Sequence, residues 1–132
     1  MKKTILPISI AIVFVLSACV STQAVADYND FIVESTDRMD MQCGEVAEIM
    51  GLWFEGQTVD VAALETEQNE FSAASATCLA ELQAYSVPNA DTCKAMQTVV
   101  LDYTNNTIAL AKAYDEVVAY IKDHNPATDG DA

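Results

Sequence analysis

The sequence predicts an all-α protein: an up-down-up antiparallel bundle of three helices that follows an N-terminal signal segment. Three observations predict it. After residue 27, apolar residues recur in three stripes with alternating steps of three and four, the period of one helix face. Proline occurs there only at positions 88 and 126, and glycine is scarce. No run alternates with the period of two that is typical of a strand.

The first helix is expected to begin at Tyr28 or Ser35 and to end near Phe54, where Gly51 and Gly56 loosen it. The second is expected over residues 59–86, with Thr58 or Asp60 as its cap. The stripe of the first helix is Ile32, Met39, Cys43, Val46, Met50 and Trp53, and that of the second is Val61, Leu64, Gln68, Phe71, Ser75, Cys78, Leu82 and Tyr85. Each helix therefore has one face to bury against the others.

Pro88 marks the clearest turn, and Asp91 is the expected cap of a third helix over residues 92–123. Its predicted stripe is Cys93, Met96, Val100, Tyr103, Thr107, Leu110, Tyr114, Val117 and Ile121. The polar members Gln68, Tyr103 and Thr107 are expected to form one hydrogen-bonded layer that fixes the register. Asn125 and Pro126 end the helix, so residues 28–124 form the bundle and residues 125–132 a disordered tail.

The N-terminus has the pattern of a secretory signal. Lys2 and Lys3 precede an apolar run over residues 5–16, which is too short for a membrane span of ~20 residues. The four residues that close it, Leu16-Ser17-Ala18-Cys19, resemble the lipobox of bacterial membrane lipoproteins. The resemblance implies removal of residues 1–18, acylation of Cys19 with chains such as palmitate, and a lipidated tether over residues 19–27. Several acyl chains hold a protein firmly at a membrane.

The alternative is an ordinary signal peptidase site at Ala24-Val25-Ala26, which would release a soluble periplasmic or secreted protein beginning at Asp27. The lipobox is favoured because Cys19 comes directly after the apolar run. By analogy with sorting in enteric bacteria, Val20 after the acylated cysteine favours the outer membrane. The expected location is therefore the cell envelope, on an outer membrane and facing the periplasm.

The chain is strongly acidic, and loss of Lys2 and Lys3 with the signal would change its formal charge from −14 to −16. Such a charge repels nucleic acid and anionic headgroups, so no nucleic-acid partner is expected. It attracts basic proteins or cations, although an acidic surface also serves solubility alone.

Apart from Cys19, three cysteines belong to the folded part, Cys43, Cys78 and Cys93, and all three lie on the predicted stripes. Export allows disulfides to persist, and an odd count allows one intramolecular bridge and one free thiol. Cys78 and Cys93 flank the Pro88 turn but lie about six residues out of level, or ~9 Å. The favoured pairing is still Cys78–Cys93, with Cys43 a buried free thiol, and the other pairings stay open.

No catalytic residues, metal ligands or cofactor are expected. His124 is the only histidine and lies at a helix end, and there is no Cys-x-x-Cys or Glu-x-x-His pair. Glu45 with Glu48, and Glu67 with Glu70, are read as surface charge rather than as an acid/base pair. An enzymatic role is therefore not expected.

A cluster of apolar residues ends the first helix: Ile49, Met50, Leu52, Trp53 and Phe54. One helical stripe cannot bury all five. We expect Leu52, Trp53 and Phe54 to form a partner-binding patch at the end of the bundle far from the anchor, unless the following loop covers them. The expected function is therefore that of an accessory or interaction protein, including an immunity protein or inhibitor with a basic target. The alternative is a small-ligand or cation carrier with an interior cavity lined by Gln68, Tyr103 and Tyr114.

Overall fold

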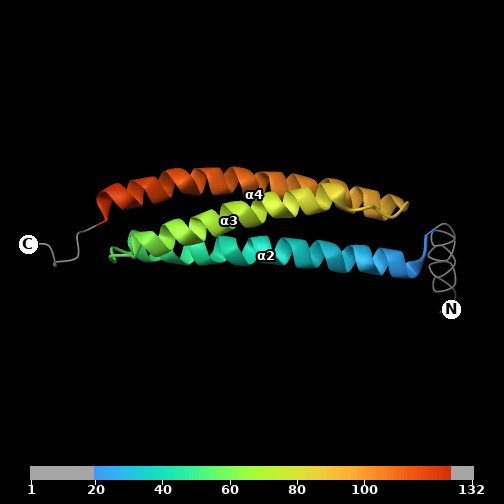
Figure 1. Cartoon of the computed structure of the whole chain (residues 1–132), viewed down its shortest axis with the longest axis horizontal. Helices are drawn as coiled ribbons and strands as arrows, with labels where there is room; N and C mark the ends of the chain where they lie inside the picture. The colour runs from blue at the N-terminus through green and yellow to red at the C-terminus, as the bar shows by residue number, and fades with distance from the viewer. Residues whose placement is uncertain (1–19, 126–132) are drawn as a thin grey trace, which may run out of the picture.

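The computed structural model describes residues 20–125, and within them the protein is all-α. Three helices follow one another: α2 over Thr22–Phe54, α3 over Val61–Ala84 and α4 over Asp91–His124. Figure 1 shows them as an elongated antiparallel bundle in which α3 runs between α2 and α4. Both α2 and α4 pack extensively against α3 and touch each other much less. None of the described helices is long and apolar enough to cross a membrane.

The first helix begins earlier than the sequence predicted. Ser21 caps α2, because its hydroxyl accepts a hydrogen bond from the backbone N–H of Ala24 at 3.0 Å. The expected tether over residues 19–27 is therefore helical from Thr22 onward, and Ala24-Val25-Ala26 lies in the first turns of α2. The expected signal over residues 1–18, the expected acylation site at Cys19 and residues 126–132 lie outside the described residues.

The buried faces of α2 and α3 follow the predicted stripes. On α2, Tyr28, Ile32, Ser35, Met39, Val46 and Met50 are buried, while Cys43 and Trp53 are half-buried. On α3, Leu64, Gln68, Phe71, Ser75, Cys78 and Leu82 are buried. Asp60 caps this helix, as one of the two predicted choices, through a 3.0 Å hydrogen bond from the N–H of Ala63. The alternating three-four pattern was sufficient to identify both core faces.

The predicted stripe of α4 is partly wrong. Met96, Tyr103 and Leu110 are exposed, and the buried positions are Cys93, Val100, Thr104, Thr107, Ala111, Val118 and Ile121. The prediction favoured the larger apolar residues, but α3 presents small buried side chains at Ser75 and Cys78. Small residues on both helices allow the backbones to approach closely, so Thr104 and Ala111 face α3.

The turn before α4 also differs in detail. Ala90 rather than Asp91 is the capping residue, and no side chain caps the helix there. Asp91 is the first helical residue, where its negative charge complements the helix dipole.

Candidate functional site

The end of the bundle opposite residue 20 brings together the C-termini of α2 and α4 with the α2–α3 loop (Figure 1). We call this end the tip. At the end of α2, Leu52 is 39% exposed and Phe54 is 68% exposed, while Trp53 is half-buried. The α2–α3 loop therefore does not cover the predicted patch.

The exposed aromatic surface of the tip extends onto α4. The Trp53 ring meets Phe54 edge-on with centroids 5.3 Å apart, and meets Tyr120 of α4 in the same manner at 5.9 Å. Tyr120 stacks in turn on His124, with centroids 4.0 Å apart. We call Trp53, Phe54, Tyr120 and His124 the tip cluster. Edge-to-face and stacked contacts favour one arrangement of these rings, so the tip presents an ordered surface.

Sequence reasoning missed Tyr120 and His124 as members of this site. Tyr120 fell outside the predicted stripe, and His124, which is exposed at the end of α4, was considered only as a possible metal ligand. One signal was available: in an up-down-up bundle the first and third helices run in the same direction, so their C-terminal ends share one tip.

The α2–α3 loop is fastened to the end of α4 rather than to the tip cluster. Gly56 adopts a positive φ of 85°, and Val59 is buried at the end of the core. The Asn125 side chain accepts a hydrogen bond from the Val59 N–H at 3.3 Å and donates one to its carbonyl at 3.0 Å. Asn125, expected to begin a disordered tail, is therefore fixed in place.

The charge around the tip is predominantly negative. Glu55 and Asp123 are exposed beside the tip cluster. Lys122 is paired with Glu65 of α3 at 2.6 Å, and the carboxylate raises the pKa of this lysine. Its charge is therefore balanced within the chain, and the tip offers aromatic rings beside the exposed carboxylates of Glu55 and Asp123.

The predicted Cys78–Cys93 disulfide is absent, and Cys43, Cys78 and Cys93 are free thiols in the structure. The sulfur of Cys78 lies 3.7 Å from the Thr104 hydroxyl, so Cys78 is level with a residue eleven positions beyond Cys93. That offset is ~16 Å along α4, too far for a bridge. Burial raises the pKa of the Cys78 thiol, and it also raises that of the half-buried Cys43.

The polar positions of the core do not form the single predicted layer. Gln68 donates to the Ala111 carbonyl at 2.7 Å and to Asp115 at 2.8 Å. Thr107 bonds instead to the carbonyl of Tyr103 within its own helix, and the Tyr103 hydroxyl bonds to Asp40 of α2. Gln68 thus bonds at the α3–α4 interface and Tyr103 at the α2–α4 interface.

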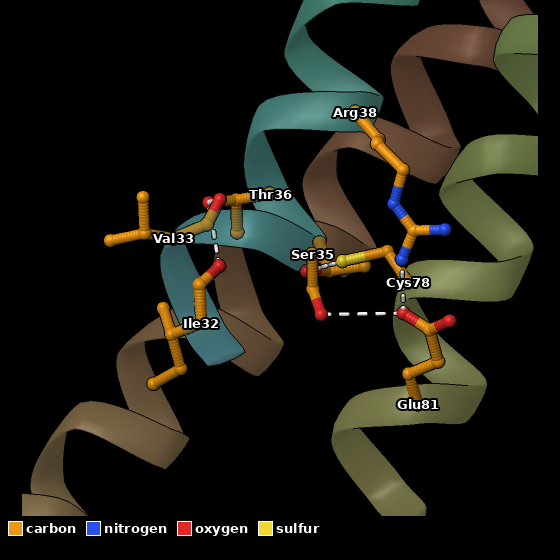
Figure 2. Close-up of polar contacts among 8 residues, drawn as sticks. Ile32, Val33, Ser35, Thr36, Arg38, Cys78 and Glu81 are labelled. Atoms are coloured by element: carbon orange, nitrogen blue, oxygen red, sulfur yellow. Dashed lines mark hydrogen bonds and ion pairs between the residues drawn. The ribbon is translucent and has the colours of Figure 1, made fainter. Parts of the chain in front are cut away.

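Two open grooves accompany the helix interfaces. One, of about 470 Å³, lies between α3 and α4 and is lined by Glu65, Gln68, Asn69, Asp115, Val118, Ala119 and Lys122. The other, of about 370 Å³, lies between α2 and α3 and is lined by Phe31, Glu34, Ser35, Arg38, Glu81, Ala84 and Tyr85. Figure 2 shows that Ser35 and Arg38 of α2 meet the same carboxylate, Glu81 of α3, at 3.3 and 2.7 Å. Both grooves are bridged by ion pairs between their walls.

Two of the predicted surface carboxylates face one another across helices. Hydrogen bonding and repulsion from Glu45 of α2 raise the pKa of Glu67 on α3. Over residues 20–125 the structure has no group of three or more histidine, cysteine or acidic side chains that could hold a metal ion.

Comparison with protein-family models, with curated proteins and with solved structures found no match to this chain. The residues and geometry of the tip are therefore the basis on which a function is assigned.

Proposed function

We propose that this chain is a lipid-anchored, acidic protein of the bacterial cell envelope that binds a protein partner through its tip and has no enzymatic role. The observation that carries the proposal is the exposed tip cluster, with Phe54 68% exposed beside an ordered Trp53–Tyr120 contact. Solvent-exposed aromatic groups of this kind are typical of contact surfaces, where tryptophan and tyrosine supply much of the binding energy.

The position of the tip supports this role. Acylation at Cys19 would hold the chain at a membrane just before the start of α2. The 33 residues of α2 then carry the tip ~50 Å from that anchor. An anchored protein of this shape presents its far end to partners in the periplasm. The outer membrane facing the periplasm is the location that Val20 favours.

The charge indicates the chemistry of the partner. Carboxylates beside exposed aromatic rings favour a basic surface, because arginine and lysine both pair with carboxylates and stack on ring faces. An immunity protein or inhibitor that neutralises a basic toxin or hydrolase is a specific version of this function. Gln68 and Tyr103, two of the three residues expected to line an interior cavity, bond at different helix interfaces, which favours a surface contact over a carrier role.

The anchor is tested by metabolic labelling with a palmitate analogue. The wild-type chain should carry the label, and Cys19→Ser should lose it. A soluble product that begins at Asp27 would overturn the lipoprotein part of the proposal.

The tip is tested by crosslinking in native membranes. Phe54→Ser should reduce partner capture at least tenfold and leave thermal stability nearly unchanged, because most of the ring is in solvent. Met41→Ser is the matched control: Met41 is 55% exposed on α2, away from the tip, and its loss should leave capture unchanged. Equal capture by wild type and Phe54→Ser would overturn the tip as the binding site.

A further inference from the structure

A second apolar stripe runs along α4 and is uncovered in the structure. Met96, Val99, Tyr103, Leu110 and Tyr120 are each at least 40% exposed, and Val99 reaches 68%. Their spacings of three, four, seven and ten residues keep them on one heptad face, together with the half-buried Val117. Helix α4 therefore has two adjacent apolar faces, of which α3 covers one.

This stripe borders α2. The hydroxyl of Tyr103 bonds to Asp40 of α2, and the ring of Tyr120 contacts Trp53. On the α2 side, a line of mostly small residues follows the same direction: Asp40, Gly44, Ala47, Gly51 and Phe54. We call the exposed α4 stripe and this α2 line together the α2–α4 face. It ends at the tip cluster.

The glycines of this line have no packing role within the chain. A Cβ atom added at Gly44 or Gly51 would meet nothing within 4 Å. Glycine inside a helix costs roughly 0.5–1 kcal/mol relative to alanine. Gly44 and Gly51 lie seven residues apart beside the uncovered apolar stripe. Because they have no side chains, another helix can approach the α2 backbone closely there.

The outer edge of the stripe is acidic. Asp102, Glu116 and Asp123 are exposed and share one heptad position beside the apolar residues. The three lysines of α4, Lys94, Lys112 and Lys122, occupy other heptad positions. A second copy of this chain would place carboxylates against carboxylates along this edge. A helix with basic residues would neutralise them.

We propose that the α2–α4 face binds one amphipathic helix of a basic protein partner, with apolar residues on the α4 stripe and lysine or arginine opposite Asp102, Glu116 and Asp123. The inference rests on the proposed function, since the same partner would cover the tip. From Met96 to Tyr120 the face extends ~36 Å, so it fits a helix of about 20–25 residues. The bound helix would complete a four-helix bundle.

The test uses the full chain and two fluorescent peptides of about 24 residues with the same leucine heptads. One peptide carries lysine at the flanking positions and the other glutamate, and binding is followed by anisotropy at physiological salt. We expect the lysine peptide to bind and the glutamate peptide not to bind. Val99→Asp should weaken binding at least tenfold without lowering thermal stability, since Val99 is largely in solvent.

Charge-reversal variants distinguish binding at the acidic edge of the α2–α4 face from non-specific attraction between a basic peptide and an acidic protein. The Asp102→Lys, Glu116→Lys pair should reverse the preference and select the glutamate peptide. Glu70→Lys, compared with Glu116→Lys alone, is the matched control, because Glu70 is an exposed acid on α3, which is not part of the face. Equal effects of these two single reversals would overturn the inference.

Other occupants give distinguishable results. Dimerisation of the chain, or binding to vesicles, that Val99→Asp abolishes would overturn the helix proposal in favour of that occupant. Partner capture that Phe54→Ser abolishes and Val99→Asp leaves intact would also overturn it, while the tip remained the binding site. The proposed function fails separately, when Phe54→Ser has no effect on capture.

Discussion

The Tyr103 hydroxyl of α4 donates a hydrogen bond to the Asp40 carboxylate of α2 across 2.5 Å, although Tyr103 is 44% exposed. This bond joins two helices that otherwise make few contacts. It also raises the pKa of Tyr103 from 10.0 to about 12, chiefly because the bonded carboxylate disfavours the phenolate.

We therefore predict that one tyrosine titrates near pH 12. The stabilising contribution of the Tyr103–Asp40 bond should be fully present below pH 10 and be lost as the pH rises to about 12. Phenolate absorbance measures the titration. Tyr103→Phe should remove this component, and Asp40→Asn should lower its pKa; an unchanged component in both variants would contradict the assignment.

The Glu45–Glu67 pair should destabilise the bundle at neutral pH. The pKa of Glu67 is raised in the folded protein, so the fold favours its protonated form. This contribution to stability is present at low pH and is lost as the pH rises and both carboxyls ionise. Glu67→Gln should therefore raise the melting temperature at pH 7, and the gain should shrink below about pH 4.

Glu48→Gln is the control for this pair, because it removes one carboxylate from an exposed position of α2. Circular dichroism melts at both pH values measure the effect. A gain of the same size from Glu48→Gln would mean that overall charge, rather than the facing pair, limits stability.

Asn125 should stabilise the tip through its two hydrogen bonds to Val59. At ~0.5–1.5 kcal/mol for each bond, Asn125→Ala should lower the free energy of unfolding by ~1–3 kcal/mol, as measured by urea denaturation. Asn105→Ala, at an exposed position inside α4, should not lower it. A neutral Asn125→Ala variant would mean that the loop is held by the burial of Val59 alone.

The three thiols should remain unpaired in the folded chain. Peptide mapping without reductant should recover Cys43, Cys78 and Cys93 unlinked. A maleimide reagent should label half-buried Cys43 first, and should label Cys78 and Cys93 only as the protein unfolds. A linked Cys78–Cys93 peptide would show that α3 and α4 can shift by several turns from the register that places Cys78 beside Thr104.

The sequence predicted that Leu52 or Phe54 would lie outside the buried stripe unless the loop covered them, because too many apolar residues compete for one stripe; both are exposed. It did not predict Tyr120 and His124 as their neighbours, because that contact joins residues almost seventy positions apart. The predicted Cys78–Cys93 disulfide is absent from the structure because the position of the Pro88 turn does not determine which residues of α3 and α4 lie side by side. Gln97 bonds to the Leu82 carbonyl, and Cys78 meets Thr104 instead of Cys93.

The sequence by itself determined three helices, their approximate ends and the buried faces of α2 and α3. These features depend on local periodicity, capping residues and the position of Pro88, which are properties of neighbouring residues. Only the tertiary structure decided which of two apolar faces α4 buries. Small residues at Ser75, Cys78, Thr104 and Ala111 let α3 and α4 approach closely, and the larger residues Met96, Tyr103 and Leu110 were left in solvent. The apolar residues of both α4 faces recur with the same helical period, so periodicity could not show which face is buried. The packing of α4 on α3 determined it.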